Sequence, residues 1–373
     1  MPNYLVIATS GRAIAQGLAS LGCSVAVVDG FADCDTCAAA TEVQKIKRTQ
    51  FGLDHHSVVQ AIQYLLSKTS FDGVFFDAAI ESNSELLEII NIHPVLGNSS
   101  RVIESVKNAE IFFSKLDQYS IPHPKITFNS SSNLLSDDAW LLKHAHGTGG
   151  VGVTPINADV VMPENVYFQK KLDGVCFSIT FLANGNDIYA LGFNTLWHES
   201  LGISMPYAYA GAINQVKLDD SLQKAALKYT KVLIKEFELV GLNSIDFIYA
   251  NDSIYVLEIN PRIPATYELY ESKYGELIEQ HIQACLHQIL PKTRSKPLLR
   301  AHAIVYAPTE IMIPGDMSWP LWAADRPQSQ EVIKKFEPVC SIFAGGKNTA
   351  QACEMIKSRK QSILAKFLVK STH

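Results

Sequence analysis

The sequence predicts an α/β protein with an N-terminal parallel-sheet domain, α+β domains in the middle and a small C-terminal cap. Three observations support this prediction. Strand-like and helix-like patterns alternate over the first part of the chain, a glycine-rich loop and a hairpin pattern follow, and a Pro-rich rhythm begins near residue 295. A chain of 373 residues also exceeds the size that one hydrophobic core usually reaches. We expect domain boundaries that give residues 1–104, 105–294 and 295–373.

Apolar strand patterns in the N-terminal part lie at residues 4–8, 25–29 and 73–77. Helix patterns separate them, at Ala13 to Leu21 and near residues 57–68. Repeated strand, helix, strand units with apolar strands are typical of a parallel sheet that helices cover on both faces. The first domain is therefore expected to be a parallel α/β sheet.

The loops at the carboxyl ends of these strands are candidate substrate contacts. The first loop lacks the GxGxxG dinucleotide fingerprint. Ligands of parallel sheets nevertheless bind beyond the carboxyl ends of the strands. The alternative is that these residues are ordinary turn and surface residues. The candidates are Ser10, Gly11, Arg12, Asp77 and Glu81.

Composition favours a globular protein. Apolar residues make up 47% of the chain and charged residues 18%. The net charge of −5 gives no overall basic footprint for nucleic acid, and no apolar run approaches the roughly 18 residues of a membrane span. The seven cysteines are scattered, and the pair Cys34 and Cys37 has no second ligand pair nearby. We expect a cytoplasmic protein without nucleic acid or membrane partners.

A glycine-rich loop follows the apolar run that ends at Lys143. Glycines let backbone amides approach phosphate oxygens, and a preceding lysine supplies a positive charge. A flexible hairpin turn is the alternative interpretation. The candidate phosphate contacts are Lys143, Gly147, Thr148, Gly149 and Gly150.

Two β-rich runs flank a turn of Asn, Asp and Ser and predict a hairpin. With a three-residue loop at 251–253, Asp246 lies opposite Glu258, and Asn260 shares their face. Opposed carboxylates repel unless a cation lies between them, and oxygen ligands beside phosphates suit Mg²⁺. Surface carboxylates are the alternative, but the neighbouring apolar residues would make unpaired charges costly.

Several motifs occur in the order of the ATP-grasp superfamily, which the chain resembles. They are Lys107 opening a helix that leads to IPHP, Lys143 before GTGGVG, the strand VYFQKKLDG, and the pair SIDF with VLEINPR. That helix is expected as one helix from about Ser105 to Tyr119. The N-terminal part resembles the Rossmann-like domain that precedes ATP-grasp domains. The C-terminal part resembles the closing domain of the biotin-carboxylase-like branch. The chain is also similar to ATP-grasp proteins tied to one-carbon cofactor biosynthesis, including tyramine–glutamate ligases.

The resemblance implies that ATP binds with Mg²⁺, or with Mn²⁺, between two α+β subdomains. Lys107 and Lys143 would contact the phosphates, and residues 147–152 would close over them. Arg262 would face the reacting carboxylate. The strand that reads adenine would hold Gln169, Lys170, Lys171 and Leu172, and the metal ligands would be Asp246, Glu258 and Asn260. Cys176 stands where many relatives carry a ribose-binding glutamate.

The resemblance points to a carboxylate–amine ligase that acts on small molecules through an acyl phosphate and releases ADP and phosphate. Arg262 and Lys143 are the expected catalytic residues. Two alternatives are a bicarbonate-activating carboxylase of the purine-pathway type and a non-catalytic ATP-binding sensor. A homodimer is a further expectation from the resemblance. Additional candidate substrate contacts are His198, Glu199 and Gly211.

Overall fold

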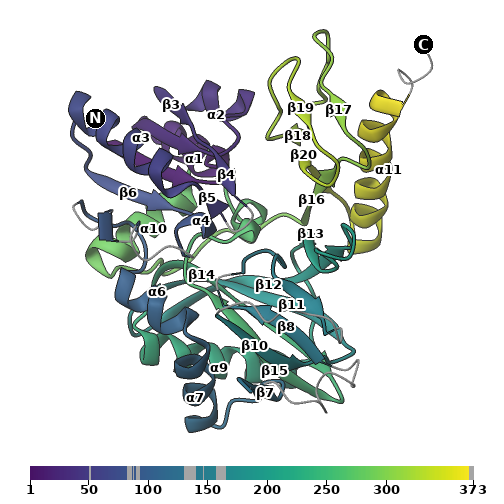
Figure 1. The fold of residues 1–373 in the computed structure, drawn as a ribbon. Coiled ribbons are helices and arrows are strands. Elements are labelled where there is room, and N and C mark those ends of the chain that lie inside the picture. The colour runs from purple at the N-terminus through teal and green to yellow at the C-terminus, as the bar shows by residue number, and fades with distance from the viewer. Residues whose placement is uncertain are drawn as a thin grey trace.

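The computed structural model describes residues 1–49, 52–81, 86, 88–89, 93–129, 140–145, 147–156 and 165–368. The N-terminal domain contains a parallel sheet of order β3-β2-β1-β6, drawn in purple in Figure 1. Its strands are β1 (Asn3–Ala8), β2 (Ser24–Asp29), β3 (Glu42–Lys45) and β6 (Gly73–Phe76). A separate two-stranded sheet pairs β4 (Arg48–Thr49) with β5 (Gly52–Leu53).

Helices cover both faces of this sheet, because successive apolar side chains of each strand point to opposite faces and both sets must be buried. Val6 packs with α1 (Arg12–Ser20) and α10 (Glu276–His287) in one core, whereas Ile7 packs with α3 (His55–Lys68) in another. Short helices described in this part include α2 (Cys34–Ala39) and α4 (Ala78–Glu81). The predicted fold class of this domain is confirmed, and each predicted strand and helix is present within two residues of its expected bounds.

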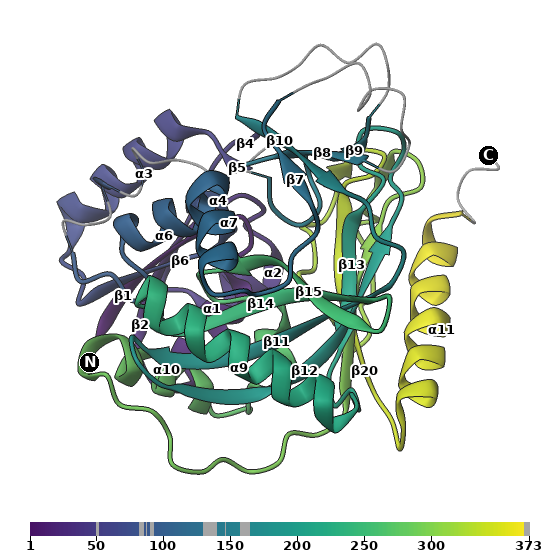
Figure 2. The ribbon, with the colours of Figure 1, turned by 90° about the horizontal axis from the view of Figure 1, so that it is seen from below.

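Two sheets form the middle of the chain. A small sheet has the order β7-β10-β8-β9, and its strands are β7 (Ile126–Thr127), β8 (Trp140–His144), β9 (Val153–Pro155) and β10 (Val166–Lys170). A large sheet begins with β15-β14-β11-β12-β13. These strands are β11 (Val175–Asn184), β12 (Ile188–Glu199), β13 (Ala208–Ile213), β14 (Val240–Ala250) and β15 (Ser253–Asn260). Helix α9 (Asp220–Phe237) packs on the large sheet through Leu233 and Phe237 (Figure 2).

The C-terminal strands continue the large sheet. β16 (Arg300–Tyr306) pairs with β13, and β20 (Pro338–Gly345) and β18 (Ala323–Ala324) follow. Helix α11 (Thr349–Leu368) covers them, seen in yellow in Figure 1. A small pair of strands joins β17 (Ile311–Met312) to β19 (Val332–Ile333). The C-terminal part is thus hydrogen-bonded into the same sheet as the hairpin of β14 and β15.

The single helix expected from Ser105 to Tyr119 is two helices, α6 (Ser100–Lys107) and α7 (Ala109–Gln118). Asn108 separates them, because its backbone is extended and its side chain accepts a hydrogen bond of 3.0 Å from the amide of Ile111. Asn is a strong N-cap, so it begins a new helix rather than continuing the old one. Lys107 therefore ends α6 instead of opening a helix.

The hairpin of β14 and β15 places Asp246 opposite Glu258 as predicted, but by a different route. Its turn has two residues, Asn251 and Asp252, which both have positive φ, and Ala250 lies opposite Ser253. A β-bulge between Asp246 and Phe247 then shifts the register by one residue. The predicted three-residue loop is wrong, and the bulge restores the predicted opposition.

No helix within the described residues is long and apolar enough to cross a membrane. A short 3-10 helix, η1 (Ala265–Leu269), follows the hairpin and leads back to α10.

Candidate active site

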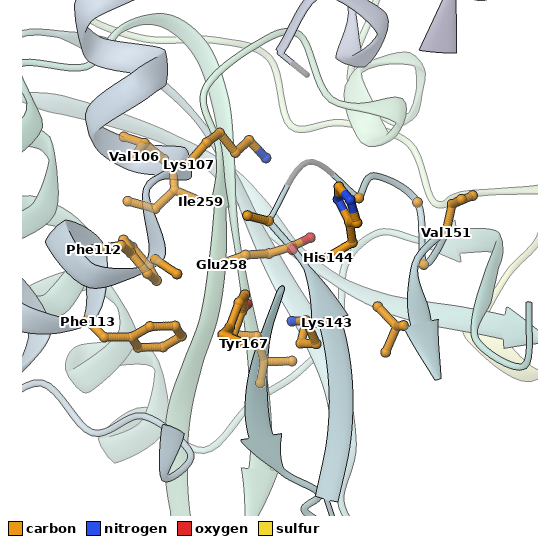
Figure 3. Close-up of a pocket in the computed structure, with 17 residues that line it drawn as sticks. Val106, Lys107, Phe112, Phe113, Lys143, His144, Val151, Tyr167, Glu258 and Ile259 are labelled. Carbon is orange, nitrogen blue, oxygen red and sulfur yellow. The ribbon is translucent and has the colours of Figure 1, made fainter. Parts of the chain in front are cut away.

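The two central sheets and α6 bring most of the predicted phosphate residues and one predicted metal ligand, Glu258, to one cavity of about 50 Å³. Lys107 enters it from the end of α6, Lys143 from β8 and Glu258 from β15 (Figure 3). Backbone and side chains of the glycine loop complete the wall, and Tyr167 of β10 lies beside Lys143. The structure therefore collects cationic, anionic and glycine groups that lie far apart in the sequence.

Lys143 is held in this cavity by nearby anionic and polar groups. Burial alone would lower its pKa, but Tyr167, Glu258 and Asp246 outweigh burial, so the pKa lies above its ordinary value. Its Nζ also donates a hydrogen bond of 3.4 Å to Oε1 of Gln169. Lys143 is therefore a charged ammonium in a buried site, which suits the neutralisation of phosphate.

Gln169 of β10 has an unused donor. Its side chain is 3% exposed, and its Nε2 has no hydrogen-bond partner among the described residues. Buried donors without partners are rare in native proteins because each loses its hydration. A bound nucleotide with acceptor nitrogens or oxygens would satisfy this group, so the residues present fit such a ligand.

The opposed carboxylates Asp246 and Glu258 are both half-buried, and each shifts the pKa of the other. Burial and then the Glu258 charge raise the pKa of Asp246 well above its ordinary value. Burial also disfavours ionised Glu258, but Lys143, Lys107 and Arg262 outweigh it and hold its pKa below the ordinary value. The protein alone thus disfavours two negative charges here, and a divalent cation would relieve that repulsion.

Asn260 completes the candidate metal set. Its Nδ2 donates to Oδ2 of Asp246 at 3.3 Å, and its Oδ1 accepts from Arg262 at 2.9 Å. Two carboxylates and one amide oxygen are hard ligands of the kind that Mg²⁺ prefers. The donor chemistry therefore fits Mg²⁺.

Glu81 of the N-terminal domain lies between two cations of the site. Its Oε2 is 2.8 Å from Nζ of Lys107, and its Oε1 is 2.9 Å from Nε of Arg262. The side chain of Glu81 is 1% exposed, and those of Lys107 and Arg262 are 11% exposed. One buried carboxylate therefore fixes the positions of two positive groups that would otherwise repel each other.

The glycine loop is folded back over the cavity. The amide of Gly147 donates to the carbonyl of His144 at 2.9 Å, and the amide of Val151 donates to the carbonyl of Thr148 at 3.1 Å. Gly149 and Gly150 both have positive φ. The loop therefore lies over the cavity in a conformation that two glycines favour.

The predicted adenine strand is only partly regular. β10 ends at Lys170, whose Nζ lies 5.5 Å from the centre of the Trp140 ring. Lys171 is exposed and lies 3.9 Å from Asp173, and Leu172 is half-buried in the following loop. Adenine recognition by Lys170, Lys171 and Leu172 stays a prediction.

Two candidate substrate residues lie next to the site. Asp77 accepts hydrogen bonds of 2.8 Å from the amides of Thr9 and Ala79, and burial raises its pKa to about 6, although nearby Arg262 opposes that rise. Burial lowers the pKa of His198, while the nearby Glu258 opposes the shift. The pKa of each residue thus depends on a charged group of the candidate site, which is Arg262 for Asp77 and Glu258 for His198.

Other candidate substrate residues make internal contacts. Oγ of Ser10 donates to Asp325 at 3.0 Å, and the amide of Gly11 donates to Asp29 at 2.7 Å. Glu199 pairs with Lys360 at 2.5 Å. Gly211, with φ of +144°, packs against the carbonyl of His302. Substrate contact by these residues stays a prediction.

Arg12 is a buried connection between domains. Its guanidinium donates to both Glu268 oxygens, at 2.5 and 2.6 Å, and its Nε donates to Asp325 at 2.7 Å. The Arg12 side chain is 5% exposed, and its positive charge is paired with the carboxylates of Glu268 and Asp325 inside the protein. These contacts join α1, η1 and the C-terminal part.

Sequence reasoning missed Tyr167 and Asp325, and it noted Tyr209 only as part of a segment that could contact substrate. The electrostatic neighbours of the Tyr209 phenol include Asp246 and Arg262, although Tyr209 carries no motif. Tyr167 stands inside the strand VYFQKKLDG and could have been noted from its alternation with Gln169. No local signal identifies Asp325, because its partner Arg12 lies in another domain.

Comparison with known proteins agrees with this geometry. A family model described as "ATP-grasp domain" matches residues 107–266. A tyramine–L-glutamate ligase of Methanocaldococcus jannaschii is 26% identical over 230 residues, which cover 60% of this chain and 65% of that protein. The matched regions span 18 to 65% of the lengths of the curated relatives, so less than two thirds of each.

Solved structures match nearly the whole chain. N5-carboxyaminoimidazole ribonucleotide synthetase from Thermotoga maritima has a TM-score of 0.69 at 15% identity and covers 97% of this chain and 98% of its own. An L-amino acid ligase from Bacillus licheniformis has a TM-score of 0.71 at 15% identity and covers 97% of both chains. At these identities the likeness establishes the fold. Residues 107–266 therefore match the ATP-grasp domain family, and the chain as a whole shares its fold with these two enzymes.

Proposed function

We propose that this protein is an ATP- and Mg²⁺-dependent carboxylate–amine ligase that acts on small molecules and releases ADP and phosphate. The observation that carries the proposal is the convergence of Lys107, Lys143, Glu258 and the glycine loop at one buried cavity. The similarity to a tyramine–L-glutamate ligase and to an L-amino acid ligase supports the formation of a carbon–nitrogen bond.

In this proposal the residues divide the work of phosphoryl transfer. Lys107 and Lys143 neutralise the phosphate oxygens, and Gln169 donates its unused Nε2 hydrogen to the nucleotide. Asp246, Glu258 and Asn260 would hold Mg²⁺, which supplies charge neutralisation at the phosphates. Arg262 orients the carboxylate of the substrate and is itself held by Glu81 and Asn260.

The bond changes balance in two steps. A carboxylate oxygen of the substrate attacks the γ-phosphorus, the bond to the β-phosphate oxygen breaks, and ADP leaves. The amine then attacks the acyl carbon, phosphate leaves, and the amine loses a proton. Arg262 faces the oxygen that becomes negative during this attack, and the closed glycine loop excludes water from the acyl phosphate.

The test is nucleotide turnover with Mg²⁺ that measures ADP, AMP and phosphate separately. Amino acids, polyamines, tyramine with glutamate, and bicarbonate form the substrate panel. The proposal predicts equal amounts of ADP and phosphate that require both a carboxylate and an amine. Formation of AMP would overturn the proposal, and dependence on bicarbonate alone would favour the carboxylase alternative. Binding of ATP without turnover across the panel would favour a sensor.

A matched pair of variants links this turnover to the cavity. Lys143→Met removes the buried ammonium, and Lys115→Met removes a lysine of α7 that pairs with Glu236 outside the cavity at 2.5 Å. We expect Lys143→Met to lower turnover by about 100-fold or more, the usual effect of losing one preorganised charge at a transition state. Lys115→Met should keep turnover within about twofold, because exposed ion pairs contribute little.

A further inference from the structure

The glycine loop touches one specific segment of the large sheet, at Tyr207 to Tyr209. The amide of Tyr209 donates a hydrogen bond of 2.9 Å to the carbonyl of Gly149. Gly150, with φ of +82°, lies so close to the carbonyl of Tyr207 that an added Cβ would overlap it. The loop therefore docks backbone to backbone, and glycine at position 150 is required for that approach.

Tyr209 also makes two contacts with the C-terminal part of the sheet. Its carbonyl accepts a hydrogen bond of 2.7 Å from the phenol of Tyr306. Its own phenol lies 2.6 Å from Nε2 of His302. Both partners belong to β16, which pairs with β13 through Gly211 and its neighbours.

The direction of the phenol–imidazole bond follows from burial. Burial raises the pKa of Tyr209 above its ordinary value and lowers the pKa of His302 to about 4. Tyr209 is then a neutral donor and His302 a neutral acceptor near pH 7. Three of the polar groups of Tyr209 are thus used, one toward the loop and two toward the C-terminal part of the sheet.

We propose that Tyr209 is a positioning residue that holds the closed glycine loop and ties its closure to β16. This inference rests on the proposed function, because closure matters where ATP reacts beneath the loop. Docking closes the cavity to water and keeps Lys143 and the loop amides over the phosphates. Two candidate substrate contacts, His198 and Gly211, lie beside Tyr209 in the sheet. A substrate bound to them would therefore also affect the surface on which the glycine loop docks.

The first test compares two glycines that both have positive φ. Gly150→Ala would overlap the Tyr207 carbonyl, whereas a Cβ at Gly149 meets no atom closer than 3.9 Å. The measurement is hydrogen exchange of the peptide that contains the Tyr209 amide, with Mg²⁺ and a non-hydrolysable ATP analogue. We expect exchange to rise about tenfold or more in Gly150→Ala, since its only described acceptor moves away, and to stay near wild type in Gly149→Ala.

The second test uses Tyr209→Phe and Tyr306→Phe, with Tyr255→Phe on β15 as the control. Tyr209→Phe and Tyr306→Phe, which we call the latch variants, each remove one hydroxyl and keep the ring. We expect the ratio of phosphate released to product formed to rise about three- to tenfold in the two latch variants, because a loosely held loop admits water. KM for ATP should change less than this ratio, and the control should match wild type.

The outcomes separate the two claims. Wild type that fails to bind the ATP analogue would overturn the proposed function, and the positioning role with it. Two outcomes would overturn the role of Tyr209 alone. One is normal nucleotide binding with a Tyr209 amide that is not protected from exchange. The other is an unchanged ratio of phosphate released to product formed in both latch variants. Protection of the amide that is lost in Gly150→Ala but kept in Gly149→Ala would support it.

Discussion

At the scale of single residues, we expect Glu81 to serve the site by positioning two cations. It is buried between Lys107 and Arg262 at ion-pair distance from both. Glu81→Gln would remove the carboxylate charge that lies between these two cations, so they would be free to separate. We expect turnover to fall about 10- to 100-fold, as for other residues that orient groups contacting the ligand. Steady-state kinetics would measure kcat and KM for ATP.

The matching control is Glu236→Gln, which breaks the surface pair with Lys115. Glu81→Asp, which keeps the charge, should recover part of the lost turnover. A purely structural role for Glu81 would instead appear as a lower unfolding midpoint with normal kinetics of the folded fraction. Kinetics within twofold of wild type in Glu81→Gln would contradict the positioning role.

At the scale of elements, His281 of α10 joins β14 to the N-terminal domain. Its Nδ1 accepts from the amide of Leu242 at 2.8 Å, and its Nε2 lies 3.0 Å from the carbonyl of Leu96. Burial lowers its pKa to about 4, even though the contact with Leu96 opposes this shift. The unfolded chain, with a pKa near 6.5, therefore binds a proton that the folded chain does not.

Stability should consequently fall as the pH drops from about 6.5 toward 4. Because of this one histidine, the free energy of unfolding of the protein should be about 2 kcal/mol lower at pH 5 than at pH 7. His281→Gln can keep one acceptor and one donor but cannot titrate. Urea unfolding at both pH values would test this, and an equal loss in wild type and variant would contradict it.

At the scale of the whole molecule, Arg12 joins three segments that are far apart in the sequence. Its partners Glu268 and Asp325 would both remain partly buried without a cation in Arg12→Met. Breaking a buried ion pair by removing one partner destabilises by about 3 to 5 kcal/mol. Urea unfolding should show a loss of this size, with Arg12→Lys intermediate because lysine lacks the bidentate fork.

The Arg12 prediction also separates structure from substrate contact. A variant that folds as stably as wild type but has a raised KM for one substrate would favour the original expectation that Arg12 contacts substrate. A large loss of stability at unchanged KM would favour the connecting role.

Much of the fold and part of the site could be predicted from local sequence patterns. Strand and helix periodicity gave the N-terminal sheet, and two-residue alternation grouped Asp246, Glu258 and Asn260. The turn length of the hairpin was misjudged, because Asn251 and Asp252 both tolerate positive φ and so allow a two-residue turn. The end of α6 and the start of α7 at Asn108 could also have been predicted, since Asn is favoured at helix N-caps.

The remaining contacts depend on tertiary packing. Glu81 meets Lys107 and Arg262 only after the N-terminal sheet packs on the hairpin, and Tyr209 meets Gly149 only after the small sheet closes on the large one. No periodicity or motif encodes such distant pairs. This is why Arg12 and Glu199 read as candidate substrate contacts, although the structure engages both in internal ion pairs.

We propose that Lys107, Lys143, Asp246 and Glu258 form one site for ATP with Mg²⁺. Calorimetric titration with a non-hydrolysable ATP analogue, with and without Mg²⁺, tests it most directly in wild type and Glu258→Gln. We expect Mg²⁺ to strengthen binding of the analogue about tenfold or more in wild type, and we expect Glu258→Gln to lose most of that gain. No binding, or an equal Mg²⁺ effect in both proteins, would contradict it.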